Sequence, residues 1–320
     1  MSLARIFVHA SQSPTEPPFA RLRAGWRLLV FAVMVEGMGE LVGLFLEYVL
    51  HVRAAGFTAT STAIGEAIQL GLAVLGTLIM ARLEGRPFSS YGVADRARVA
   101  RFWVGSLWGF LAVVALIALI LAARGLTIDG LAIHGGDLAR YLLLWTLAMI
   151  GIGLYEEVYF RGYPLYTLAS GMGFWPAAVV LSVLFGAIHF FLKPMENGFD
   201  FLSVSLIALF LCLTLRRTGS LWFAIGFHFA FDWAALFVFA APNTANQGKP
   251  LIGHLLDVRY TGPWWLTGGP LGIEASVMVF VVIAALFLLF NARYRETRWP
   301  APGAADQRTM QARVVSMRAP

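Results

Sequence analysis

The segment Leu138–Leu168, which reads LARYLLLWTLAMIGIGLYEEVYFRGYPLYTL, joins a long apolar run to two adjacent carboxylates. The apolar part up to Tyr155 is nearly long enough to cross a membrane, because a transmembrane helix needs about 20 residues. Glu156 and Glu157 follow at once, where ionisable side chains are costly and each needs a reason. The segment therefore predicts a membrane helix that carries functional polar residues.

The whole chain has the composition of a membrane protein. Hydrophobic residues make up 59% of its 320 residues and charged residues only 13%, whereas a soluble domain carries about 25% charged residues. A soluble fold of this size needs more polar residues for its surface. The formal net charge is +6, and residues 293–320 form a basic tail. Such a tail is typical of an anionic membrane surface and not of a nucleic-acid site.

Eight apolar runs are candidates for membrane-spanning helices. We therefore predict an all-α, polytopic membrane bundle with about eight transmembrane helices, located in the cell membrane (inner or plasma membrane). The runs are Trp26–Leu50, Ala63–Leu83, Phe102–Ala123, Leu138–Tyr155 with an extension to about Leu168, Phe174–Leu192, Phe201–Leu215, Leu221–Ala241 and Ile273–Ala292.

Arginine placement predicts the topology of these spans. Arginines are frequent before the first span, in the connections that follow the second and sixth spans, and after the last span, and they are sparse in the other connections. The positive-inside rule then places both termini in the cytoplasm. The predicted parts of the chain are an N-terminal cytoplasmic segment (1–24), N-terminal transmembrane helices (25–137), a helical core (138–241), an external loop with the last span (242–292) and the basic cytoplasmic tail (293–320).

The two glutamates after Tyr155 are not equivalent on a helix. Glu157 and Arg161 are four residues apart and share a face, so they can form an ion pair. Glu156 points about 100° away from Glu157 and is not neutralised by Arg161 in this way. Glu156 is therefore the better candidate for a general base. The alternative is that both glutamates flank the membrane interface with Arg161 as an anchor.

Two later spans carry histidines. His189 lies in the fifth span, where a lone histidine is more often a packing residue than a catalyst. His228 and Asp232 in the seventh span are four residues apart and can address one centre from one helix face. Such a pair suits metal ligation or the stabilisation of an oxyanion, and its alternative is a simple internal hydrogen bond. Four further glutamates in the first two spans have no assigned role: Glu36, Glu40, Glu47 and Glu66.

The joint pattern is more specific than its parts. A glutamate, two histidines and an aspartate from three spans can converge on one water molecule, which Glu156 would deprotonate for attack on a peptide carbonyl. Two other classes remain open on the residues alone. A membrane scaffold or sensor would keep the bundle without turnover, and an ion or proton transporter would use the buried groups as a relay.

The order of the motifs resembles the CPBP family, which comprises the CAAX proteases and bacteriocin-processing enzymes and is also called Abi. Glu156, Glu157 and Arg161 match its first motif, Glu-Glu-x-x-x-Arg. Phe185 and His189 match the second, Phe-x-x-x-His. The third motif, His-x-x-x-Asn or Asp, is matched by His228 and Asp232, with Asp where many members carry Asn. The resemblance covers about residues 138–241.

The resemblance implies an intramembrane endopeptidase whose site opens toward the cytoplasmic leaflet. Glu156 would activate water with help from His189, and His228 and Asp232 would stabilise the oxyanion. Glu157 and Arg161 would organise the site. In the metalloprotease description, a divalent ion such as Zn²⁺ would be held by residues among Glu156, His189, His228 and Asp232. The implied substrate is a membrane-associated protein or peptide, either a prenylated CAAX tail or a leader of the bacteriocin type.

Overall fold

A computed structural model describes residues 17–299 except 53–55, 194 and 196. Seven of its helical segments are long and apolar enough to cross a membrane, and an eighth apolar helix is shorter. The predicted all-α polytopic bundle is therefore confirmed. In chain order its principal helices are α2 (Ala24–Tyr48), α3 (Ala59–Leu83), α4 (Arg98–Ala122), α5 (Gly135–Arg161), α6 (Tyr163–Met172), α7 (Phe174–Leu192), α8 (Gly198–Thr218), α9 (Leu221–Asp232) and α11 (Val277–Arg293).

Most of the predicted spans differ from the helices by a few residues at one or both ends, and three of these differences have a clear structural cause. The fourth is divided into α5 and α6, because Pro164 near the start of α6 has no backbone N–H to donate and fits only the first turn of a helix. The sixth is longer than predicted, since α8 takes in polar residues at both ends and is capped by Asn197. The seventh ends at Asp232 as an α-helix and continues as a π-helical turn, η3 (Trp233–Val238).

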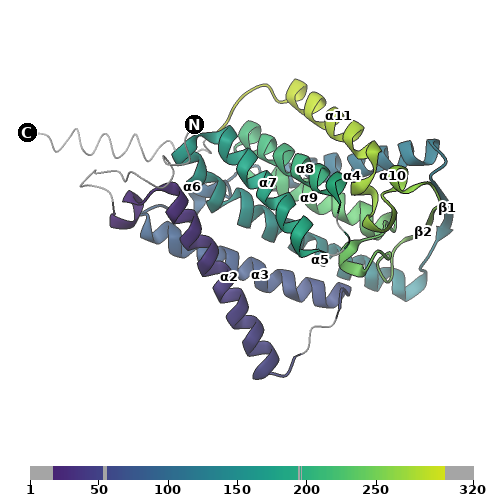
Figure 1. The fold of residues 1–320 in the computed structure, drawn as a ribbon, viewed down its shortest axis with the longest axis horizontal. Helices are drawn as coiled ribbons and strands as arrows, with labels where there is room; N and C mark the ends of the chain where they lie inside the picture. The colour runs from purple at the N-terminus through teal and green to yellow at the C-terminus, as the bar shows by residue number, and fades with distance from the viewer. Residues whose placement is uncertain (1–16, 53–55, 194, 196, 300–320) are drawn as a thin grey trace, which may run out of the picture.

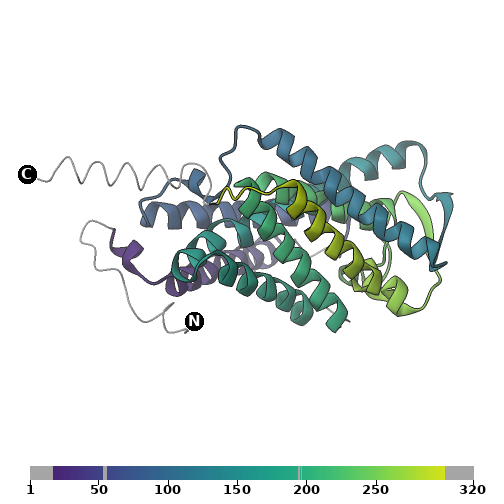
Figure 2. The same cartoon turned by 90° about the horizontal axis from the view of Figure 1, so that it is seen from above.

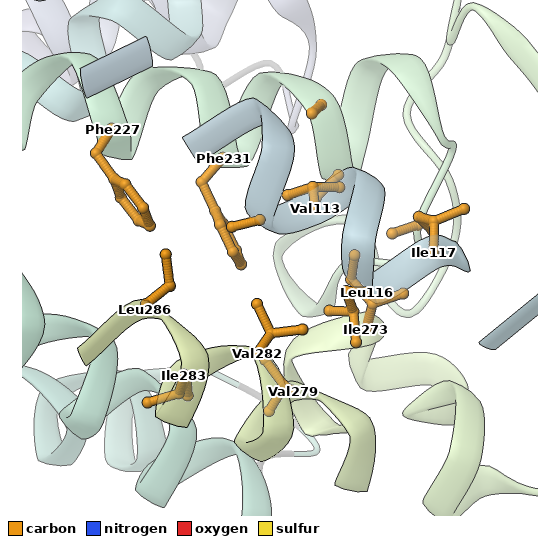
Figure 3. Close-up of a cluster of buried hydrophobic side chains, with 14 of the residues drawn as sticks. Val113, Leu116, Ile117, Phe227, Phe231, Ile273, Val279, Val282, Ile283 and Leu286 are labelled. Carbon is orange, nitrogen blue, oxygen red and sulfur yellow. The ribbon is translucent and has the colours of Figure 1, made fainter. Parts of the chain in front are cut away.

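The core of the bundle is the close packing of α4 against α9. A Cβ added at Gly105 of α4 would lie 2.1 Å from the carbonyl oxygen of Phe223, and one at Gly226 of α9 would lie 2.0 Å from that of Phe102. Small residues let membrane helices approach at this distance. Apolar side chains of α4, α9 and α11 then fill a shared cluster, in which Phe227 and Phe231 point toward α11 (Figure 3).

Replacing Gly105 by alanine is expected to destabilise the protein by about 1–3 kcal/mol, because overpacking a close contact forces the helices apart. Gly43 of α2 is the matched control, since a Cβ there meets nothing within 4 Å. Unfolding in mixed micelles of increasing denaturing-detergent content measures both variants. Equal stability of Gly105→Ala and Gly43→Ala would contradict the close contact.

The two ends of the bundle differ in structure. A two-stranded antiparallel sheet of β1 (Leu126–Leu131) and β2 (Leu256–Tyr260) lies at one end (Figure 1). Arg259 of β2 donates a hydrogen bond of 2.6 Å to Asp129 of β1 and thereby holds the pKa of that carboxyl below its usual value. The strands lie in two connections between the predicted spans, where short strands leave a weak sequence pattern.

The described chain begins and ends at the end opposite the sheet (Figures 1 and 2). Trp299 packs against the rings of Tyr166 and Phe174 there, and the backbone N–H of Arg298 donates to the carbonyl of Arg216. This placement fits an even number of crossings. Residues 1–16 and 300–320, which include much of the predicted cytoplasmic segment and basic tail, lie outside the described residues.

A buried ion pair fixes the start of α2 to the bundle. Arg27 Nη1 lies 2.9 Å from Glu84 Oε2, and Tyr163 donates its hydroxyl to the other oxygen of the same carboxylate. Arg27 also donates to Ser170 of α6 at 2.9 Å. Beyond Val35, α2 diverges from the other helices (Figure 1) and its side chains are largely exposed. These polar contacts hold the first part of α2 against the bundle.

Candidate active site

The predicted site residues come together on three helices. The C-terminal part of α5 carries the two glutamates and the arginine, α7 carries His189, and α9 carries His228 and Asp232. A cavity of about 200 Å³ is lined by Glu156, Arg161, His189, His228 and Asp232, among others. Residues on three helices, up to 76 positions apart in sequence, thus face one cavity.

Glu157 and Arg161 form the predicted ion pair. Arg161 Nη1 donates to Glu157 Oε1 at 3.0 Å, and both residues are buried, at 0% and 1% exposure. The same carboxylate oxygen lies 2.9 Å from His228 Nδ1. The guanidinium also stacks on the ring of Phe185, 4.8 Å from its centroid. Glu157 is therefore committed to holding Arg161 and His228 in place.

The other nitrogen of His228 faces two further carboxylates. Its Nε2 lies 3.5 Å from Glu156 Oε2 and 3.5 Å from Asp232 Oδ2. Both side chains are partly open to the cavity, with exposures of 20% for Glu156 and 19% for Asp232, whereas Glu157 has none. Glu156 is thus the member of the glutamate pair that water in the cavity can reach.

His189 lines the same cavity. Its Nδ1 is 3.0 Å from the backbone carbonyl of Phe185. A carbonyl only accepts, so this contact assigns the proton of a neutral imidazole to Nδ1 and leaves Nε2 as an acceptor. The ring also packs on that of Phe185, with centroids 4.5 Å apart. His189 therefore has a fixed ring and a nitrogen free for proton transfer.

Comparison with protein families identifies the segment that holds these side chains. Residues 138–234 match the family described as type II CAAX prenyl endopeptidase, Rce1-like. This match confirms the resemblance to the CPBP family that the three motifs predicted. It includes all six site residues and leaves α2, α3, α4 and α11 outside. Searches of the curated proteins and of the solved structures give no match.

The Rce1-like segment supports a CAAX-type intramembrane endopeptidase in general terms. Two helices outside this segment pack against its helices. Helix α4 packs against α9, and α3 packs along α5, where a Cβ on Gly151 would lie 2.8 Å from Glu66 Cβ. The chain outside the Rce1-like segment therefore completes the walls around the site.

Glu66 is a cavity residue to which the sequence assigned no role. It belongs to α3 and lines the same space as Glu156, His228 and Asp232, and one of its carboxylate oxygens is buried. Its signal in the sequence is a lone carboxylate within an apolar span. Glu36 of α2 instead accepts a hydrogen bond of 2.6 Å from Tyr159 of α5. Glu40 and Glu47 are exposed on the diverging part of α2.

The side chains do not form a ready metal site. Across the described part of the chain, no group of three or more His, Cys, Asp or Glu side chains is arranged to hold a metal ion. His228 has Glu157 beside Nδ1 and has Glu156 and Asp232 each 3.5 Å from Nε2. We therefore derive no catalytic step through the divalent ion that the metalloprotease description implies.

The cavity extends from the polar side chains toward the end of the bundle that carries β1 and β2. Its remaining wall includes Phe57, Lys193, Ala245 and Glu274, which all lie in connections at that end. The arginine-rich connections are at the opposite end.

Proposed function

We propose that the protein is an intramembrane endopeptidase that hydrolyses a peptide bond of a membrane-associated protein or peptide with water activated by Glu156. One observation carries this proposal. Of two adjacent glutamates, Glu157 is fully buried in contacts with Arg161 and His228, and Glu156 is open to the cavity. A carboxylate held beside accessible water in a partly closed space can act as a general base.

In the proposed reaction, Glu156 takes a proton from water and the resulting hydroxide attacks the carbonyl carbon of the scissile bond. The carbonyl oxygen gains a negative charge, which the Nε2–H of His228 would stabilise while Nδ1–H donates to Glu157. Both nitrogens of His228 can donate together only in the imidazolium form, and the carboxylates around the ring suit that form. The proton then passes to the leaving amine, with the free Nε2 of His189 assisting.

Asp232 has a positioning role in this proposal. Its carboxylate lies on the same face of α9 as His228 and 3.5 Å from its Nε2. A negative charge directly on the oxyanion would be repulsive, so Asp232 is proposed to hold the imidazole and not to touch the oxyanion. Asp232 is the last residue of α9, and the π-helical turn begins at the next residue, Trp233.

Asp232→Asn is expected to keep cleavage within about tenfold of the wild type, because an amide oxygen can still accept from His228. Asp232→Ala removes that acceptor and is expected to reduce kcat by about 10²-fold. Steady-state cleavage by the purified variants measures both. If Asp232→Asn were as inactive as Asp232→Ala, the negative charge itself would be required and the positioning role would be wrong.

The proposed substrate is either a prenylated CAAX-type tail or a leader of the bacteriocin type, presented from the lipid bilayer. Quantitative proteomics of membranes that contain the wild type or Glu156→Ala identifies it as the protein whose cleaved form is lost in the variant.

Metal analysis of the purified protein, together with cleavage in the presence of a chelator, tests whether cleavage requires a divalent ion. Full activity after chelation is the result expected for the water mechanism written above.

A further inference from the structure

A second cavity lies at the end of the bundle opposite β1 and β2 (Figure 2). Its volume is about 570 Å³, within the range of small-molecule sites, about 300–1,000 Å³. It shares no lining residue with the proposed active site. Its walls come from the start of α4, the ends of α8 and α11, the start of α9 and the segment after α11. We call it the basic cavity, after five of its lining residues: Arg101, Arg217, Arg293, Arg295 and Arg298.

The positive charge of the basic cavity is only partly balanced by the protein. Carboxylate oxygens lie 2.7 Å from Arg101 Nε and 3.2 Å from Arg298 Nη2. Among the described residues, no carboxylate lies within ion-pair distance of Arg217, Arg293 or Arg295. Like charges that gather around one space repel one another, so an anion in the cavity would stabilise this arrangement.

Arg217 shows that hydrogen-bonding capacity is also left over. Its Nη1 donates to the carbonyl of Arg295 at 2.6 Å, and its Nη2 donates to the side-chain oxygen of Asn291. Both acceptors are neutral, so they do not balance the charge of the guanidinium. The Nε of Arg217 is buried and finds no acceptor in the described part of the chain. A buried N–H without an acceptor is costly, and a bound anion would supply the missing acceptor.

The surroundings of the basic cavity favour a lipid as the source of this anion. The cavity lies at the ends of apolar helices, which is where a bilayer places its headgroups. Val104 of α4 lines the cavity and is exposed. Leu107 and Leu111 follow three and seven residues later on the same helix face, and both are exposed. An acyl chain attached to a group in the cavity can therefore lie along an apolar stripe, which a free anion would not need.

We propose that the basic cavity binds the phosphate group of an anionic phospholipid. Arginine matches phosphate because its planar guanidinium donates two parallel hydrogen bonds to two oxygens, and basic pockets between membrane helices bind acidic headgroups. The proposal holds for either orientation of the chain in the membrane, because each leaflet has headgroups. It is also independent of the proposed endopeptidase function.

Lipid binding to the full-length protein tests the proposal directly. The protein is purified in a non-ionic detergent, freed of lipid and titrated with dioctanoyl phosphatidylglycerol or dioctanoyl phosphatidylcholine, and native mass spectrometry gives the apparent Kd. Both lipids carry a phosphate, but only phosphatidylglycerol has a net negative charge. We expect it to bind at least about tenfold more tightly. Equal affinities for the two lipids would overturn the proposal.

A matched pair of double variants places the binding in the cavity. Arg293→Gln with Arg295→Gln removes two lining charges that are exposed in the lipid-free protein and should weaken binding of phosphatidylglycerol about tenfold or more. Arg96→Gln with Arg98→Gln removes the same charge from exposed positions that do not line the cavity and should leave the Kd within about twofold. Equal weakening in the two pairs would show attraction to the general surface charge and would overturn the cavity as the site.

The single variant Arg293→Gln keeps the test decisive if the double variant does not fold, because Arg293 packs only on the ring of Tyr294 among the described contacts. It should weaken binding about threefold or more, and an unchanged Kd would contradict the site. Inorganic phosphate, added as a competitor at the concentration of the lipid, is expected to leave phosphatidylglycerol bound. Its displacement by inorganic phosphate would assign the cavity to a soluble anion and overturn the lipid as the ligand.

Discussion

Replacing Glu156 by glutamine is expected to reduce peptide cleavage by at least about 10³-fold while the protein remains folded, because the amide cannot take the proton from water. Glutamine keeps the size of the side chain, and the position is partly open to the cavity, so little packing is lost. Cleavage rates of the purified variant in lipid, together with its unfolding transition, separate loss of the base from loss of structure.

Glu40 supplies the control for this result. It is also a membrane glutamate, yet it is exposed on α2 and does not line the cavity. Glu40→Gln should therefore cleave at the wild-type rate. Substantial activity in Glu156→Gln, or an equal loss in Glu40→Gln, would remove Glu156 from the role of the base.

Replacing Arg161 by methionine is expected to cost about 3–5 kcal/mol of stability, because it removes the buried guanidinium that pairs with the fully buried carboxylate of Glu157. Arg161 also contacts Phe185 on α7, so its loss loosens the junction between α5 and α7. Unfolding in mixed micelles of increasing denaturing-detergent content measures the change in the free energy of unfolding.

The ion pair of Arg298 with Glu296 provides the matched comparison. Arg298 Nη2 lies 3.2 Å from Glu296 Oε2, a separation similar to that of the buried pair, but the two side chains are 54% and 78% exposed. Arg298→Met should therefore change stability by less than about 1 kcal/mol. A loss of similar size in both variants would show that burial of the Glu157–Arg161 pair is not what makes it important.

The sequence predicted the features that depend on a single helix, namely the spans and the contacts between residues four apart. Apolar runs predicted the spans to within a few residues in most cases, because lipid requires a fixed helix length. The spacing of four residues predicted the contact between Glu157 and Arg161, since that geometry is local. The spacing also predicted that His228 and Asp232 share a face, and their separation is 3.5 Å in the structure.

The sequence was less informative where distant segments meet. Glu66 reaches the cavity because α3 packs against Gly151 of α5, and the spacing within α3 does not encode that contact. The pairing of β1 with β2 and the contact of Arg27 with Glu84 depend in the same way on the packing of the bundle. The direction of the cavity follows from which connections surround it, and no single motif contains that information.

The most direct test of the central claim is cleavage of an identified membrane peptide by the purified protein in water enriched in the heavy oxygen isotope, with the product analysed by mass spectrometry after a single turnover. If water activated by Glu156 attacks the peptide bond, the new carboxyl terminus carries one heavy oxygen atom and Glu156→Gln forms no product. A product without the heavy isotope after that turnover would show that an enzyme carboxylate attacks the peptide bond and transfers its own oxygen, and the absence of any cleavage by the wild type would contradict the account as a whole.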